Sequence, residues 1–178
     1  MTDEFLDKAT DAALALAAER PWRDVSLREI AERAGVDFAA LYAKAPAKPL
    51  LVLRLSQRLD RAALATAATP SDDVHDRLFD ATMARVEAME AHRTALISIA
   101  RGAGAITLAP HFPLTARAIL EAAGVTATPP RLAAMSLVWA RVARVWRDDE
   151  GALNRTMAEI DKRLKQMRTR LGRIGAGF

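Results

Sequence analysis

Apolar residues recur at spacings of three and four along most of this 178-residue chain, which is the periodicity of helices that bury one face. The first such segment runs from about residue 4 to residue 19, and Pro21 prevents its continuation. Composition agrees with this pattern, because alanine and leucine dominate and tyrosine occurs once. We therefore expect an all-α protein.

Residues 25–51, VSLREIAERAGVDFAALYAKAPAKPLL, contain the start and stop signals of two short helices joined by a tight turn. Ser26 is a good N-cap, and Glu29 follows three residues later, as in a capping box. Gly35 suits the left-handed conformation that ends many helices, and Asp37 can cap the next helix at once. The spacing predicts a helix-turn-helix.

The rest of the chain is predicted to be helical, with breaks at segments rich in glycine, proline or small polar residues. Pro49 is acceptable at the start of a fourth helix that reaches about residue 68. Residues 101–105, RGAGA, are expected to end a helix that begins near residue 92. The later helices are predicted over residues 72–90, 92–101, 112–123, 129–147 and 151–173.

The segment over residues 25–51 resembles the N-terminal domain of the tetracycline-repressor (TetR) family. SLREIAERAGV, the LY pair and PAKPLL match the family pattern in order and spacing. The resemblance implies an all-α TetR-like fold, with a three-helix helix-turn-helix DNA-binding head over residues 1–50. Residues 51–178 would form a larger helical body for ligand binding and dimerisation. The implied function is a ligand-responsive transcriptional regulator, a repressor that binds a palindromic operator as a homodimer.

The resemblance also assigns roles to individual residues of the head. Phe38, Ala39 and Ala40 would lie nearest the base edges in the major groove of operator DNA. The phosphate contacts would come from polar side chains of the same segment: Ser26, Tyr42, Lys44 and Lys48. Two residues depart from the family pattern, since Asp37 replaces a neutral hydroxyl residue and Ala45 replaces an aromatic one.

Basic charge is concentrated away from the predicted head. Residues 1–60 hold nine Lys and Arg against ten Asp and Glu, a net charge of −1, and residues 61–159 balance at eleven each. Residues 160–178 hold six basic side chains and a single acidic one, Asp161. Because non-specific DNA affinity grows with the number of phosphates neutralised, the head is expected to make few ionic contacts.

The C-terminal half suggests an alternative function. DRLFDATMARVEAMEAHR, PLTARAILEAAGV and WARVARVWRDDEGALNRTMAEIDKRL resemble the lipid-binding accessory protein of ubiquinone biosynthesis, which shares the TetR-like fold. This resemblance implies an isoprenoid-lipid cavity and a basic amphipathic C-terminal helix that meets the membrane surface beside a quinone-biosynthesis partner. The candidate membrane-contacting residues are Leu164, Met167, Arg168, Leu171 and Ile174.

Heptad-like rows of apolar residues mark the last two predicted helices, starting at Leu132 and Leu153. We expect these helices to pack into the core and into a dimer, as an intersubunit four-helix bundle. Alternatively, part of the first row, Met135, Trp139 and Val142, lines a cavity for a small and mostly apolar ligand.

Nothing in the sequence favours catalysis. The absence of cysteine excludes disulfides, thiolate metal sites and thiol chemistry, and the three histidines are too dispersed for a metal motif. Asp148, Asp149 and Glu150 are interpreted as a solvated turn. We therefore expect no enzyme activity, no cofactor and no metal. An acidic start and the lack of an apolar run of ~20 residues favour a cytoplasmic protein, at the inner membrane face under the alternative.

Overall fold

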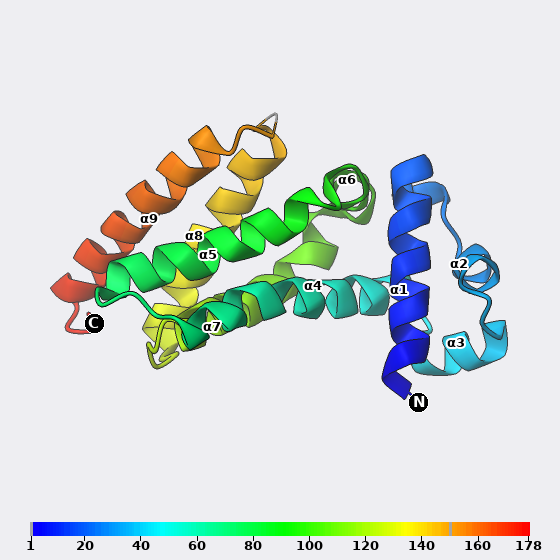
Figure 1. Cartoon of the computed structure of the whole chain (residues 1–178), viewed down its shortest axis with the longest axis horizontal. Helices are drawn as coiled ribbons and strands as arrows, with labels where there is room; N and C mark the ends of the chain where they lie inside the picture. Colours follow the sequence, from blue (N-terminus) through cyan, green and yellow to red (C-terminus); the bar gives the residue numbers. More distant parts are fainter. Residues whose placement is uncertain (1, 150) are drawn as a thin grey trace. The chain divides into compact units, whose positions relative to one another are not determined.

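A computed structural model describes the backbone of residues 2–149 and 151–178 and the side chains of residues 4–103, 109–149 and 151–178. All regular structure in these residues is helical, which confirms the expected fold class (Figure 1). The α-helices are α1 (Thr2–Glu19), α2 (Leu27–Ala34), α3 (Phe38–Lys44), α4 (Lys48–Ala65), α5 (Val74–Glu90), α6 (Arg93–Leu108), α7 (Phe112–Ala122), α8 (Pro129–Arg147) and α9 (Asn154–Arg173). Single 3-10 turns lie at η1 (Trp22–Asp24), η2 (Thr66–Ala68) and η3 (Ala109–His111).

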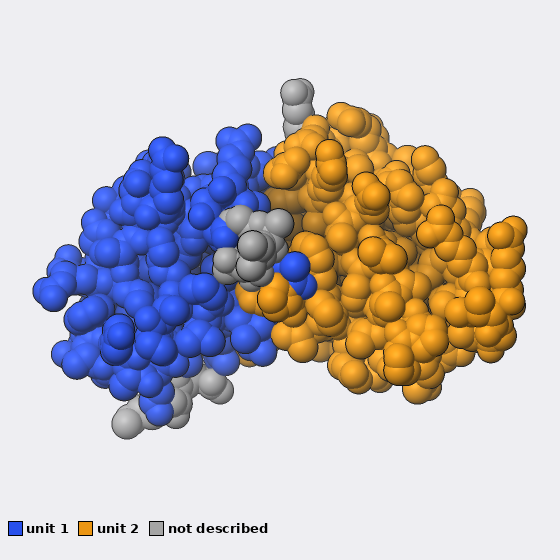
Figure 2. Space-filling model, turned by 180° about the vertical axis from the view of Figure 1, so that it is seen from behind, with its two compact units in different colours: residues 1–58, 91–109 blue, residues 59–90, 110–178 orange. Residues whose placement is uncertain are grey.

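The chain divides into two compact units, which Figure 2 colours separately. Unit 1 comprises residues 1–58 and 91–109, and unit 2 comprises residues 59–90 and 110–178. α6 belongs to unit 1, despite its distance in sequence, because it packs against α1 and η1. The predicted domains, a DNA-binding head and a ligand-binding body that meet near residue 50, are defined by their functions. This division stays a prediction.

Local signals determine where α2 and α3 begin and end. The Ser26 hydroxyl accepts a hydrogen bond from the Glu29 amide at 3.2 Å, and the Ser26 amide donates to Glu29 Oε2 at 2.9 Å, which completes the capping box. Gly35 has a φ of 63° and ends α2. The Asp37 carboxylate caps α3 by accepting from the Ala40 amide at 2.7 Å. The predicted helix-turn-helix is confirmed.

The core of unit 1 gathers around Trp22, which is only 3% exposed. Leu14 of α1, Leu51 and Leu55 of α4 and Ile99 of α6 are buried around it. Full burial of such a side chain stabilises the fold by about 1.5–3 kcal/mol. The core thus fixes η1, which carries Trp22, against α1, which directly precedes it, and against α4 and α6, which are distant in sequence.

The expected helix break at residues 101–105 is wrong, because α6 continues to Leu108. A Cβ atom at Gly102 would lie 3.0 Å from the Trp22 Cβ and 3.0 Å from the Arg23 amide nitrogen. Glycine therefore allows α6 to approach the backbone of η1 closely. The packing offsets the helix penalty of about 1 kcal/mol that an interior glycine carries.

Unit 2 is a helical bundle in which α8 packs against α7 and α9, and α5 packs against the same two helices. The prediction of a solvated turn between α8 and α9 is wrong for Asp149. Asp149 is only 4% exposed and accepts hydrogen bonds from the Thr156 amide at 2.8 Å and the Thr156 hydroxyl at 2.7 Å. Asp148 is exposed as predicted, and Glu150 lies outside the described residues. A turn carboxylate therefore fixes the first turn of α9.

Candidate DNA-binding interface

α3 presents most of the predicted recognition residues on its surface. Ala39 and Ala40 are exposed, and Tyr42 is 55% exposed. Leu41 faces the opposite way and is fully buried, which anchors α3 to the rest of unit 1. Lys44 is exposed at the end of the helix. The structure thus exposes four of the five predicted DNA-contacting residues that lie on this short helix.

A row of three side chains connects α2 to this surface. The Arg28 guanidinium lies 5.1 Å from the centre of the Phe38 ring, and the Phe38 and Tyr42 rings are 6.2 Å apart. A cation over an aromatic ring is attracted by the negative ring face. Phe38 is therefore half-buried between Arg28 and Tyr42, and its role at base edges stays a prediction.

Arg28 was not among the predicted site residues. It occupies the first turn of α2, where the helix dipole disfavours a cation. A basic residue at that position is thus poorly explained by helix stability alone. A cation in the first turn of a helix is therefore the sequence feature that could have identified Arg28 as a candidate site residue.

Ser26 and Lys48, both predicted to contact phosphate, are engaged within the protein. The Ser26 hydroxyl also donates to Glu29 Oε2 at 2.8 Å, so a phosphate would have to replace Glu29 as its acceptor. Lys48 Nζ donates to the carbonyl oxygens of Trp22 and Val25 at 2.7 and 2.6 Å and lies 4.6 Å from the Trp22 ring centre. Burial lowers the pKa of Lys48. Ser26 thus holds the start of α2, and Lys48 holds the start of α4. The phosphate contacts of both residues stay predictions.

Most cations of residues 4–58 are paired with carboxylates of the same segment. The ion pairs join Lys8 to Glu4, Arg20 to Glu29, Arg23 to Asp24, Arg33 to Glu19, Arg54 to Asp7 and Arg58 to Asp11. Among the described side chains, Arg28, Lys44 and Lys48 have no such carboxylate partner. Two of these three, Arg28 and Lys44, are exposed and flank α3. The exposed positive charge of residues 4–58 that has no carboxylate partner is therefore small and lies beside α3.

The capping carboxylate of α2 stays ionised over a wide pH range. The Ser26 amide, the Arg20 guanidinium and the Ser26 hydroxyl donate to Glu29 and lower its pKa to about 2. Arg20 Nη2 lies 2.6 Å from Glu29 Oε1. This pair ties the start of α2 to the end of α1.

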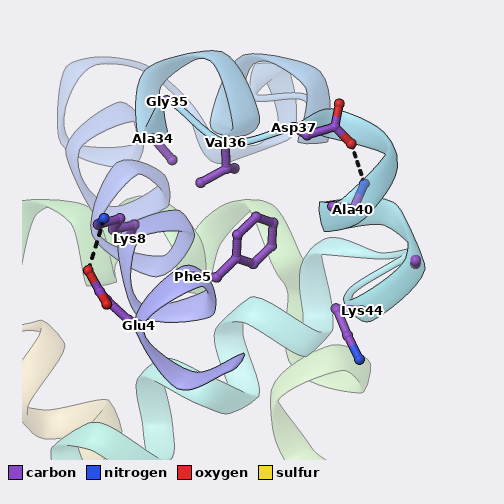
Figure 3. A pocket seen from close by; sticks show the side chains of 10 residues that line it. Glu4, Phe5, Lys8, Ala34, Gly35, Val36, Asp37, Ala40 and Lys44 are labelled. Carbon is purple, nitrogen blue, oxygen red and sulfur yellow. Dashed lines mark hydrogen bonds and ion pairs between the residues drawn. The ribbon is translucent and has the colours of Figure 1, made fainter. Parts of the chain in front are cut away.

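A hollow of about 820 Å³ lies between the N-terminal part of α1 and the helix-turn-helix (Figure 3). Phe5 of α1 and Val36 of the turn point into it, and Ala40 lies on its α3 side. The Glu4 and Lys8 side chains pair with each other at 3.0 Å beside it. The side of α3 that faces α1 is thus covered less completely than the side anchored by Leu41.

Comparison with known families agrees with this geometry. Residues 9–55 match the sequence model of the family described as bacterial regulatory proteins, tetR family. Within this segment the chain is similar to the TetR family. The match covers α1 from residue 9 onward, η1, α2, α3 and the first turns of α4. A comparison with curated proteins finds no match.

Solved structures of similar fold cover nearly the whole of this chain. A TetR transcriptional regulator from Rhodococcus sp. RHA1 is 18% identical, with a TM-score of 0.71 over 94% of this chain and 97% of that one. A tetR-family transcriptional regulator from Streptomyces coelicolor is 20% identical, with a TM-score of 0.58 over 96% and 84% of the two chains. A further transcriptional regulator from Rhodococcus sp. Rha1 is 20% identical, with a TM-score of 0.57 over 92% and 96%. These similarities confirm the TetR-like fold.

The predicted ligand-cavity residues lie in the core of unit 2. Met135 and Val142 are fully buried, and Trp139 is 3% exposed. The Arg85 guanidinium lies 4.3 Å from the centre of the Trp139 ring, and Arg85 Nε donates to Asp60 at 2.6 Å. The apolar row is thus bordered by a buried ion pair, which the sequence pattern did not reveal.

The membrane-contact candidates of α9 do not form an exposed apolar face. Leu164, Met167 and Leu171 are at most 3% exposed, since α9 packs against α5 and α8. Arg168 is exposed, and Ile174 is 67% exposed just beyond the helix. The packing of unit 2 thus accounts for the apolar row of α9, and the lipid-accessory alternative gains no support.

Two further observations concern the described residues only. None of their helices is long and apolar enough to cross a membrane. No group of three or more His, Cys, Asp or Glu side chains among them is arranged to hold a metal ion.

Proposed function

We propose that this protein is a TetR-family regulator, namely a ligand-responsive repressor that binds a palindromic operator as a homodimer. The observation that carries the proposal is the surface of α3, where Ala39, Ala40 and Tyr42 are exposed beside Lys44 and Arg28. Two copies of such a short helix, related by a two-fold axis, would read two half-sites of opposite orientation.

Readout by this surface would rest on few specific contacts. The methyl groups of Ala39 and Ala40 can contact thymine methyl groups but cannot donate or accept hydrogen bonds. The exposed Tyr42 side chain supplies a hydroxyl for a phosphate or a base edge. Arg28 and Lys44 supply the exposed positive charge. Such an interface favours A·T-containing half-sites and a modest dependence on salt.

Dimerisation is supported by apolar side chains that the bundle leaves exposed. Leu137 of α8 is 67% exposed and Met157 of α9 is 41% exposed. Burying them against a second copy would remove apolar surface from water. We therefore place the contact between copies on α8 and α9.

The effector pocket is proposed in unit 2, beside Met135, Trp139 and Val142. A ligand that enters there would also meet the Asp60–Arg85 pair, whose Nε–Oδ1 distance is 2.6 Å. An amphipathic ligand, with an apolar body and one polar group, would satisfy both kinds of neighbour. Preferential binding to one conformation would then change operator affinity.

The proposal is tested by selecting binding sites from a random DNA library and measuring affinity by fluorescence anisotropy at two salt concentrations. Lys44→Ala should weaken binding to all sequences. It should also reduce the slope of log affinity against log salt concentration by about 1. Tyr42→Phe removes only the hydroxyl and should weaken binding less. Lys162→Ala, which removes an exposed charge from α9, is the matched control. Failure to select any sequence, or equal effects of Lys44→Ala and Lys162→Ala, would contradict the proposal.

A further inference from the structure

Unit 1 contains a cleft that the proposed DNA contacts do not use. It has a volume of about 610 Å³ and lies between the end of α1, the η1 turn and the first part of α6. Its walls include Ala17, Trp22 and Ile97. A cleft of this size with partly apolar walls is large enough for a small organic molecule.

Four arginines, Arg20, Arg23, Arg93 and Arg101, are among the residues that line the cleft. The single carboxylate in the lining is Glu19, and both of its oxygens accept hydrogen bonds from Arg33, at 2.9 and 2.6 Å. Arg23 is only loosely paired with Asp24, at 3.7 Å. Arginines therefore outnumber carboxylates among these lining residues, although the sequence of residues 1–60 has a net charge of −1.

One polar atom of the lining lacks a partner. Arg20 Nε is buried and has no hydrogen-bond partner, while Nη2 of the same side chain is paired with Glu29. A buried N–H without an acceptor is rare in folded proteins and needs an explanation. An anionic group bound in the cleft would supply the missing acceptor after a small movement of the side chain.

We propose that this cleft is a binding site for a small organic anion, with an apolar part against Trp22 and Ile97 and a carboxylate or phosphate group held by the arginines. Planar guanidinium groups bind both kinds of anion through paired, charge-assisted hydrogen bonds. The site is separate from the effector pocket proposed in unit 2. The apolar walls distinguish the expected ligand from inorganic phosphate.

The surroundings of the cleft connect it to the DNA-binding helices. Arg20 is paired with Glu29, which forms the capping box of α2. The carbonyl of Trp22 accepts from Lys48, the first residue of α4. An anion that attracts Arg20 would loosen the pair with Glu29, and its negative charge would oppose DNA phosphates. The bound anion should therefore weaken operator binding. This consequence rests on the proposed function, but the binding of an anion in the cleft does not depend on it.

Occupancy is tested by titrating the full-length protein with phenyl phosphate and following assigned backbone amide resonances by NMR, without DNA. Saturable shifts are expected at Thr94, Ser98 and Gly102. Loss of charge in Arg23→Gln/Arg101→Gln should weaken binding by about tenfold or more, because two charge-assisted contacts are removed. The matched control is Arg61→Gln/Arg117→Gln, which removes two exposed arginines of unit 2 and should leave binding unchanged.

A second variant separates filling of the cleft from loss of charge. Thr94 is exposed in the lining, so Thr94→Trp should occupy the space without disturbing the core and should abolish the shifts. Benzyl alcohol, which lacks the charge, and inorganic phosphate, which lacks the ring, should both bind more weakly than phenyl phosphate. The proposal is overturned if phenyl phosphate gives no saturable shifts, if either variant binds it like the wild type, or if inorganic phosphate binds equally well.

Discussion

In unit 1 the ion pairs lie near the surface, whereas the Asp60–Arg85 pair of unit 2 lies inside the bundle. The side chains of Arg85 and Asp60 are 5% and 9% exposed, while those of Arg58 and Asp11 are 27% and 61% exposed. Thr115 donates a further hydrogen bond to Asp60 at 3.1 Å. A surface pair is weakened by water and salt, but a buried charge depends on its partner. The same kind of contact therefore has different consequences in the two units.

The largest effect is expected from Asp60→Ala. This change leaves the Arg85 guanidinium buried without its carboxylate, which should destabilise the protein by about 3–5 kcal/mol in urea unfolding. Asp11→Ala, which breaks the exposed pair with Arg58, should cost less than about 1 kcal/mol. Similar losses in the two variants would show that burial does not distinguish these pairs.

A second comparison concerns two helical glycines, Gly102 of α6 and Gly172 of α9. Gly102→Ala places a methyl group 3.0 Å from the Trp22 Cβ and the Arg23 amide nitrogen, which should destabilise the protein by about 1–3 kcal/mol. Gly172→Ala adds its methyl group in open space and should stabilise α9 by about 0.5–1 kcal/mol. Thermal unfolding of both variants measures the difference. Stabilisation by both substitutions would mean that Gly102 is not needed for the approach of α6 to η1.

The smallest effect is expected from the surface network of unit 1 and depends on pH. Since folding lowers the pKa of Glu29 from near 4.5 to about 2, the stability it contributes is present above pH 4.5 and is lost as the pH falls toward 2. The stability difference between the wild type and Glu29→Gln should therefore shrink between pH 5 and pH 2.5. Chemical unfolding at several pH values measures this change. Glu32→Gln, at an exposed position of the same helix, controls for the loss of charge.

The helix-turn-helix could be predicted in detail because its determinants are local. Ser26, Glu29, Gly35 and Asp37 act within three residues of the backbone groups they satisfy, so a single sequence suffices to identify them. The resemblance to the TetR family was carried by the same segment. The fold of the whole chain then followed from that family, not from the pattern of the body.

The features that could not be predicted depend on contacts between distant residues. Gly102 looked like a helix breaker, because its contact with Trp22 cannot be read from neighbouring residues. Asp149 looked solvated, because its burial depends on its hydrogen bonds to Thr156 in the first turn of α9. The row Met135, Trp139 and Val142 was recognised as apolar, but the buried Arg85 beside it comes from another helix.

The sequence indicated where the predicted DNA-contacting residues lie, but it did not indicate the hydrogen bonds that they make within the protein. Ala39, Ala40, Tyr42 and Lys44 all lie at the surface of α3 as the resemblance implied. The hydroxyl of Ser26 is already engaged, and sequence patterns do not report competition for a donor or acceptor. Whether these residues contact DNA stays a prediction.

The ion pairs between the end of α1 and α2 have a consequence for protein engineering. Arg20 pairs with Glu29 and Glu19 pairs with Arg33, so the helix-turn-helix is fastened to residues that precede it in the chain. A hybrid regulator that receives only α2 and α3 would lose both partners. The transplantable cassette should therefore begin before Glu19 and include η1, so that the donated helices keep the charges that orient them.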